Sequence, residues 1–384
     1  MADFYIDPVN GTPGGAGTEG DPLDKIVTNP VTGNNYYFKR GTVSNNDYKI
    51  NVSGQTASTL LIDAYGEGAP PVITYYYTSD DPNDWSLTET NVWQFTAPSN
   101  GPVPIGLGRL GTKSNPSWTE RRNYTNLAGP QDTDFDEFGQ WDHADAGTTL
   151  YIYSNQNPVD KWGAVYYVTI TDNQIISVGG NNTNVTIQNL KFMYGVTGVR
   201  VEPFSGNTAT TVKVANNVSE HCWWGLSFGS SDAAFLDGVI CEYNEIDATG
   251  STGLRGYGAN PVNNQSVFRY NKIDSVGYAE SIGGIYTQLL GTASLPFLWT
   301  MNEVSNVLRT PYWNESHGLY VDGNLTTTYN TFLHNRVTNV GGNGMHNNTG
   351  GDGNKWLGNL IVNADRGYRH TESVYSGNAT PTAI

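Results

Sequence analysis

Two neighbouring segments in the C-terminal half combine aromatic, acidic and basic side chains that could act on a sugar. They are SVGYAESIG at 275–283 and SNVLRTPYWNESH at 305–317. Aromatic rings can stack on sugar rings, while carboxylates and histidine can bind hydroxyl groups or move protons. The candidates are Tyr278, Glu280, Arg309, Tyr312, Trp313, Glu315 and His317. The alternative is a pair of capping loops that only shield a groove.

A second set of candidates follows the glycines that recur through this half of the chain. One residue in each strand after such a glycine should point outward: Arg200, Ser227, Arg255, Tyr286, Tyr320, His346 and Arg369. Asp322, two residues after Tyr320, should share that side. Parallel stacking would place successive members roughly 4.8 Å apart. Since an arginine is rarely buried without a partner, we expect a surface column. Its polarity would also suit an ordinary solvated face.

A lyase that acts on a uronic acid could use this column. Such an enzyme needs a base for the proton beside the carboxylate and a cation that stabilises the developing charge. Tyr320, His317 or His346 could be the base, and Arg255 or Arg369 the cation.

A glycosidase needs two carboxylates instead. Their separation is about 5 Å for retention of configuration and about 6.5–9.5 Å for inversion. Glu280, Glu315 and Asp322 lie close enough in the repeat to supply such a pair. We therefore predict catalytic roles for these three residues, His317 and Tyr320. The predicted substrate-binding residues are Arg255, Tyr278, Tyr286, Tyr312, Trp313, His346 and Arg369.

One acidic loop could bind Ca²⁺, with Asp132, Asp134, Asp136 and Glu137 at its start. Position six of the loop is Glu137, where an EF-hand has glycine, and position twelve is His143, where it has glutamate. We therefore favour an ordinary acidic surface loop and predict no cofactor, with Ca²⁺ as the alternative. The six histidines include no HExxH spacing, so zinc is not predicted.

The elements that position these residues recur at a fixed period. An asparagine followed two residues later by Val or Ile stands at Asn216, Asn244, Asn271, Asn302, Asn335 and Asn359. A glycine follows each of these asparagines, at Gly225, Gly253, Gly284, Gly318, Gly344 and Gly367. Two markers in step indicate one structural unit stacked on itself, a solenoid. The interval between the markers is longest after Asn271 and Asn302, where the two candidate segments stand.

The repeat unit has the pattern of β-strands. The stretch SVFRYNKIDSVG alternates apolar and polar residues, as a half-buried strand should. Neither the leucine frame of leucine-rich repeats nor a helical period is found. Parallel coils also explain the asparagines, because stacking places each amide where it can bond the next. We therefore predict a structural asparagine ladder.

The chain divides into three predicted regions. Residues 1–77 form a lead-in and the first coils, and residues 164–384 form regular coils and a tail. Between them, 78–163 breaks the rhythm and holds five of the ten tryptophans: Trp85, Trp93, Trp118, Trp141 and Trp162. We interpret this region as an inserted subdomain.

Composition excludes several classes of partner. The net charge of −16 argues against nucleic acid, and no run approaches the ~20 apolar residues of a membrane span. Cys222 and Cys241 are too few for a disulfide framework. We expect two buried thiols, with a bridge between them as the alternative.

Several stretches resemble pectate-lyase-like right-handed parallel β-helix proteins, a superfamily that includes phage tailspikes and polysaccharide-degrading enzymes. They are FYIDPVNG, DPLDKI, YYFKRGTV, INVSGQTASTLLIDAYGEGAPPVI, LYIYSNQNPVD and NVTIQNLKF. The resemblance implies an all-β, single-stranded, right-handed parallel β-helix. It implies no particular reaction, because the superfamily contains lyases, hydrolases, epimerases and proteins without known activity.

The functional prediction is a protein that binds a polysaccharide or surface glycan, with catalysis left open between lyase, hydrolase and none. The start MADFYIDPVNG has no secretory signal, so we predict a tailspike-like bacteriophage appendage, in a virion or outside cells. A homotrimer or a virion partner is expected. The alternatives are a structural or decoration protein of a virion and a bacterial lyase of the pectate or alginate type.

Overall fold

The computed structural model describes most of the chain. The described residues are 2–31, 33–45, 49–54, 59–75, 77–96, 104–110, 116–118, 141–143, 149–163, 165–169, 174–204, 206–229, 234–277, 283–308, 316–323, 328–348 and 353–371. Within them, the helical elements are η1 (Pro82–Asp84) and α1 (Pro158–Trp162), and the other regular elements are strands. The predicted all-β class is confirmed.

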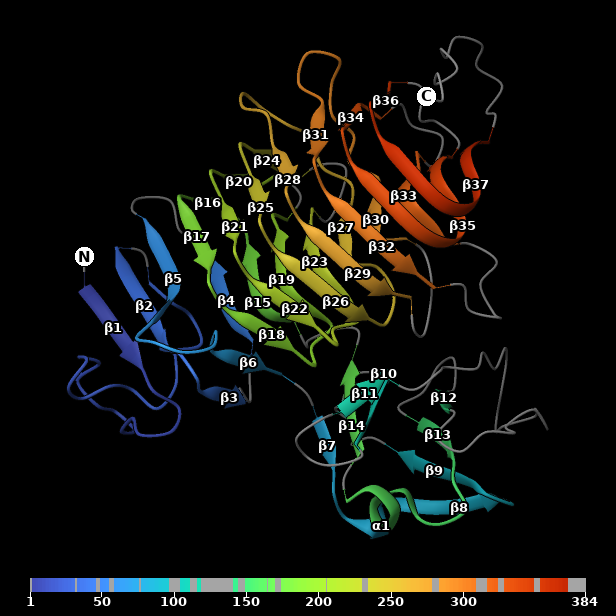
Figure 1. Ribbon diagram of the computed structural model, residues 1–384. Helices are drawn as coiled ribbons and strands as arrows, with labels where there is room; N and C mark the ends of the chain where they lie inside the picture. The colour runs from blue at the N-terminus through green and yellow to red at the C-terminus, as the bar shows by residue number, and fades with distance from the viewer. Residues whose placement is uncertain are drawn as a thin grey trace.

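Stacked coils form three parallel sheets (Figure 1). The first contains, in order, β1 (Ala2–Ile6), β2 (Asn34–Lys39), β5 (Leu60–Tyr65), β17 (Val185–Gln188), β21 (Lys213–Ala215), β25 (Ile240–Glu242), β28 (Val267–Arg269), β31 (Phe297–Thr300), β34 (Asn330–Leu333) and β36 (Lys355–Leu357). A short one contains β16 (Asn182–Thr183), β20 (Thr208–Thr210) and β24 (Phe235–Asp237). Neighbours in each sheet come from successive coils, which is the topology of a parallel β-helix.

The remaining sheet has two faces joined through long strands. One face contains β3 (Val43–Asn45), β6 (Val72–Thr74), β18 (Lys191–Met193), β22 (Val218–Glu220), β26 (Glu245–Thr249), β29 (Lys272–Val276) and β32 (Glu303–Val307). The other contains β4 (Ile50–Ser53), β15 (Gln174–Gly179), β19 (Thr197–Glu202), β23 (Trp224–Phe228), β27 (Leu254–Gly256), β30 (Ile285–Thr287) and β33 (His317–Val321). β35 (Arg336–Asn347) pairs with both, and β37 (Leu360–His370) pairs with β35.

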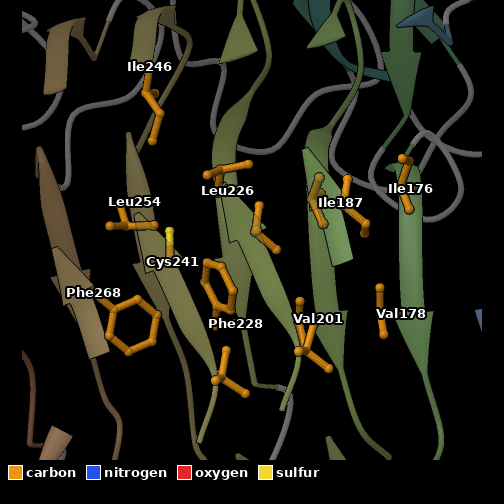
Figure 2. Packing of buried hydrophobic residues seen from close by; sticks show 14 of the residues in the cluster. Ile176, Val178, Ile187, Val201, Leu226, Phe228, Cys241, Ile246, Leu254 and Phe268 are labelled. Carbon is orange, nitrogen blue, oxygen red and sulfur yellow. The ribbon is translucent and has the colours of Figure 1, made fainter. Parts of the chain in front are cut away.

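Apolar residues at equivalent positions fill the interior. In the first sheet one inward column runs in register through Ile187, Val214, Cys241, Phe268 and Trp299, all fully buried. Figure 2 shows part of this core, with Cys241 and Phe268 on neighbouring coils and Ile187 two coils before Cys241. Cys222 and Cys241 are free and buried, which confirms the predicted thiols. No helix in the described part of the chain is long and apolar enough to cross a membrane.

The asparagine ladder is present and confirms the prediction. Each amide Nδ2 donates to the Oδ1 of the next asparagine over 2.9–3.1 Å, through Asn217, Asn244, Asn271, Asn302, Asn335 and Asn359. The first member is Asn217, so the choice of Asn216 was wrong by one residue. Asn216 lies at the bend before it, at φ 54°. Two adjacent asparagines fit the spacing, and only the backbone conformation decides between them.

The asparagine and glycine markers recur at the same period because each glycine packs against the Val or Ile that follows an asparagine. A Cβ on Gly225, Gly253, Gly284 or Gly318 would lie 2.2–2.3 Å from a methyl group of Ile246, Ile273, Val304 or Val337, respectively. Each of these β-branched residues stands two positions after a ladder asparagine. The glycine therefore leaves the space that the Val or Ile of the next coil fills.

Antiparallel strands between Tyr77 and Thr169 lie outside the stack of coils (Figure 1). One sheet contains β7 (Tyr77–Ser79), β10 (Pro104–Leu110), β11 (Pro116–Trp118) and β14 (Val165–Thr169). The other contains β8 (Trp85–Glu89), β9 (Val92–Thr96), β12 (Trp141–His143) and β13 (Thr149–Tyr153). The fold therefore includes the expected inserted subdomain, while the boundaries 1–77, 78–163 and 164–384 stay a prediction.

Candidate functional site

The predicted column of side chains is in register on the face that ends at β37. Arg255, Tyr286, Tyr320, His346 and Arg369 are successive Cα partners on β27, β30, β33, β35 and β37. The residues beside them in each strand, such as Leu319 and Val321, belong to the core. Alternation therefore directs the column to the opposite side of the sheet, as expected.

The expectation of a surface position was wrong for four members of the predicted column, of which Ser227 is only 2% exposed. Tyr286, Tyr320 and His346 are only 8%, 4% and 2% exposed, whereas Arg255 is half-buried and Arg369 is exposed. Alternation decides which side of a sheet a residue faces, and packing decides whether water reaches it. Here the rings cover one another: Tyr320 stacks on His346 with centroids 4.9 Å apart and planes within 5°.

Two further columns flank the first. Residues three positions earlier include Trp224 and His317, which begin β23 and β33, and Asn343 inside β35. His317 and Asn343 are Cα partners. Residues two positions later have backbone N–H groups that bond to the preceding coil; they include Gln288, Asp322, Asn348 and Thr371. We call the three columns together the flank site. It consists of Trp224, Arg255, Tyr286, Gln288, His317, Tyr320, Asp322, Asn343, His346, Asn348, Arg369 and Thr371.

The Asp322 carboxylate lies at the centre of the flank site. It accepts hydrogen bonds from Tyr286 Oη at 3.2 Å, Gln288 Nε2 at 2.9 Å and Asn348 Nδ2 at 3.1 Å. Asn348 Nδ2 also donates to Tyr320 Oη at 3.1 Å. Burial and the charge of Asp322 raise the pKa of Tyr286 far above its ordinary value. Tyr286 therefore stays protonated and donates to the Asp322 carboxylate.

His317 and His346 form a buried hydrogen-bonded pair, with His317 Nε2 3.2 Å from His346 Nδ1. The other two ring nitrogens are also occupied: His317 Nδ1 lies 3.0 Å from Asn343 Nδ2, and His346 Nε2 lies 2.9 Å from Thr371 Oγ1. Burial, His346 and Arg369 lower the pKa of His317 to about 3. Burial and Arg369 lower the pKa of His346 to about 4, against the opposing charge of Asp322. Both rings are therefore neutral near pH 7.

Arg255 offers a positive charge at one end of the flank site. Its guanidinium carbon lies 4.3 Å from the ring centroid of Trp224 and 5.0 Å from that of Tyr257. The nearby Arg200 is paired with Glu202 at 2.5 Å, whereas no carboxylate among the described residues forms an ion pair with Arg255. Burial lowers the pKa of Arg255 from its ordinary value. An anionic ligand would find a preoriented guanidinium here.

Part of the predicted site lies outside the described residues. Tyr278, Glu280, Arg309, Tyr312, Trp313 and Glu315 belong to this group, as do the loop residues Asp132, Asp134, Asp136 and Glu137. Among the described residues, no three His, Cys, Asp or Glu side chains gather closely enough to hold a metal ion.

Sequence reasoning missed five members of the flank site: Trp224, Gln288, Asn343, Asn348 and Thr371. A usable signal existed. Asp322 was chosen because it stands two positions after Tyr320, and the same offset from Tyr286, His346 and Arg369 reaches Gln288, Asn348 and Thr371. The three-residue offset that leads to Trp224 and Asn343 departs from the two-residue alternation of a strand, so alternation could not predict these two residues.

Comparison with known proteins supports the assignment of the fold. No protein-family model and no curated protein matches the sequence. The solved structure of XylC in complex with xylose is 13% identical, covers 96% of this chain and 70% of its own, and has a TM-score of 0.58. The stacked parallel coils and the likeness to XylC show that this chain has a parallel β-helix fold. The predicted resemblance is thus confirmed.

Two other β-helix structures are more distant. A GH136 lacto-N-biosidase from Eubacterium ramulus is 14% identical, with a TM-score of 0.46 over 96% of this chain and 68% of its own. An alginate lyase from Paenibacillus sp. is 10% identical, with a TM-score of 0.31 over 97% of this chain and 98% of its own.

Proposed function

We propose that this β-helix protein binds a polysaccharide along the flank site and acts on it there. The observation that carries the proposal is the register of five coils, which brings Arg255, Tyr320, Asp322 and Arg369 to one side of one sheet. Stacked coils offer a long surface that suits a chain-like ligand. The fold is shared with XylC, which was solved with a bound sugar, so a glycan is the ligand class to test first.

The reaction that we favour is β-elimination at a uronic acid. Tyr320 Oη, as the phenolate, would remove the proton beside the sugar carboxylate; that electron pair would form the new C=C bond, and the glycosidic C–O bond would break. The phenol of Tyr320 formed in this way would give its proton to the departing oxygen, which restores the phenolate. Arg255 would bind the sugar carboxylate and stabilise the charge that develops on it. Tyr320 is chosen over His317 and His346 because both imidazoles are held in a buried row with Asn343 and Thr371, whereas the Tyr320 hydroxyl is linked through Asn348 to the Asp322 carboxylate.

A glycoside hydrolase is the second candidate, and Asp322 is the observation that favours it. This carboxylate is half-buried and is surrounded by the donors Tyr286, Gln288 and Asn348. Its catalytic partner would be Glu280 or Glu315, both outside the described residues. Within the described flank site Asp322 is the one carboxylate, whereas a glycosidase needs two within about 9.5 Å.

The test is a panel of uronate-rich and neutral polysaccharides incubated with the wild type. Unsaturated ends that absorb in the ultraviolet would indicate a lyase, and reducing ends alone would indicate a hydrolase. Tyr320→Phe should abolish the lyase product. Tyr270→Phe is the matched control, because Tyr270 is an exposed tyrosine that stacks on Tyr243 at a different corner. Absence of binding and product with every glycan would refute the polysaccharide proposal.

The biological setting remains a separate hypothesis. A tailspike-like appendage, a virion or extracellular location and a homotrimer are predictions from the sequence. Light scattering of the purified protein would test the trimer, and the neighbouring genes would test the virion setting. Genes for sugar uptake beside this one would favour a bacterial enzyme instead.

A further inference from the structure

A directional row of hydrogen bonds crosses the last coils of the flank site. It begins at Asn343, passes through the His317 and His346 rings, and ends at Thr371, over distances of 3.0, 3.2 and 2.9 Å. Asn343, His317 and His346 are 7%, 1% and 2% exposed, so water does not compete with these bonds. Each polar atom must therefore find its partner inside the row.

The chemistry of the first residue sets the direction of the whole row. Amide Nδ2 of Asn343 can only donate, so Nδ1 of His317 must accept. A neutral His317 then carries its proton on Nε2 and donates to Nδ1 of His346. His346 in turn carries its proton on Nε2 and donates to Thr371 Oγ1. Both imidazoles are thus held as Nε2–H tautomers.

We propose that Asn343 is a positioning residue, which fixes the tautomers of both histidines and holds His346 as a neutral ring against Tyr320. The ring stack between His346 and Tyr320 depends on this arrangement, because a flipped imidazole would lose both of its partners. His317 also contacts Tyr320, with ring centroids 4.5 Å apart. Two neutral rings leave the tyrosine hydroxyl aligned with Asn348 and Asp322, without a cation stacked on its ring.

The charged and titratable groups around the pair agree with a neutral state. Tyr320 and Asp322 approach from β33 and the residue after it, and Arg369 and His370 approach from β37. Burial, Arg369 and His370 lower the pKa of His346, against the attraction of Asp322 for a proton on that ring. The tautomers can be measured without any substrate. The consequence for turnover rests on the proposed function.

Nitrogen-15 NMR of the histidine side chains in the full-length protein tests the proposal. The wild type should show Nε2–H tautomers for both rings at pH 7. Asn343→Asp replaces the donor by a carboxylate acceptor, so a proton should appear on Nδ1 of His317. The pKa of His317 should then rise from about 3 toward the ordinary histidine range. Asn339→Asp, an exposed change of the same charge in the same strand, should alter neither signal.

Two further variants keep the test decisive if Asn343→Asp folds poorly. Asn343→Ala removes the donor, so His317 should populate both tautomers. Thr371→Val removes the far end of the row and should leave His317 in its wild-type tautomer, since the direction is set at Asn343. A wild-type His317 with its proton on Nδ1, or an Asn343→Asp protein with an unchanged His317, would overturn the proposal.

Activity gives an independent arm of the experiment. If the glycan reaction is established, Asn343→Asp should move the acid side of its pH profile toward neutral pH, and Asn339→Asp should not. Correct tautomers without any glycan reaction would leave the positioning role standing and refute only the proposed function. A reaction with unaltered pH dependence in Asn343→Asp would contradict the link between Asn343 and Tyr320.

Discussion

The asparagine ladder and the flank site are both stacks of side chains in register. They differ in whether polar or charged groups remain available to a ligand. The ladder repeats one residue type from Asn217 to Asn359, and each amide both donates to and accepts from its neighbours. The flank site mixes residue types along its column, from Arg255 through the tyrosine pair Tyr286 and Tyr320 to His346 and Arg369.

This difference separates scaffold from candidate chemistry. Because an amide has both a donor and an acceptor, identical asparagines satisfy one another and no group remains for a ligand. Side chains of different types cannot satisfy one another's donors and acceptors in this way. Among the described residues Arg255 has no carboxylate partner, Asp322 is half-buried and Arg369 is exposed. We infer that a repeated residue in a solenoid marks structure, and that a change of residue type in the same register marks a site.

Breaking the ladder should have the largest effect on stability. In Asn271→Ala, the backbone N–H and Nδ2 of Asn244 lose their acceptor, and the Cys241 carbonyl loses a donor. Since each buried unsatisfied group costs about 1–3 kcal/mol, we expect a loss of about 4 kcal/mol in the free energy of unfolding. Denaturant titration would measure it. A loss below about 1 kcal/mol would show that the ladder is not the scaffold.

Removing the Tyr320 hydroxyl should affect chemistry and leave the fold intact. In Tyr320→Phe, Asn348 keeps its bond to Asp322, so stability should change little. Loss of a general base lowers turnover by roughly 10²–10⁴-fold, so a loss of at least a hundredfold, about 2.7 kcal/mol in the barrier, is expected. Initial rates on the active glycan provide the measurement. Wild-type rates would remove Tyr320 from the reaction.

Lowering the pH should reduce the stability that the flank-site histidines contribute and should not affect the asparagine ladder. The pKa values of His317 and His346 are lowered to about 3 and about 4, below the ordinary histidine value of about 6.5. Between these values the unfolded chain binds more protons, so this contribution to stability is complete above pH 6.5 and falls as the pH drops. The slope is about 1.4 kcal/mol per pH unit for each histidine. Unfolding midpoints from pH 7 to pH 4 should therefore be flatter for a His317→Gln/His346→Gln variant than for the wild type.

We expect the smallest effect on the free energy of unfolding from a change in a second asparagine stack, which is exposed. Asn339 donates to Asn306 and accepts from Asn363, as in the buried ladder, but it faces water. Asn339→Asp should change the free energy of unfolding by no more than about 0.5 kcal/mol, because water replaces the lost bond. A loss similar to that of Asn271→Ala would mean that stacking, and not burial, gives the ladder its strength.

The coil could be predicted because its signal lies within a single repeat. Gly225 and its equivalents recur since the β-branched residue of the next coil, such as Ile246, occupies the space that a Cβ would need. The column from Arg255 to Arg369 follows from the same period, so its register was also predictable. Asn217 shows the limit: with two adjacent asparagines, the bend at Asn216 decides which one enters the ladder.

The sequence by itself determined the β-helix and the side of the sheet that carries Tyr320, His346 and their neighbours, because period and alternation are properties of one chain. Only the tertiary structure decided that these rings are buried, that His317 bonds to Asn343 and that Asn348 joins Tyr320 to Asp322. These contacts join residues 26–29 positions apart, on different coils. Their existence depends on how neighbouring coils pack, which no pattern within one repeat contains.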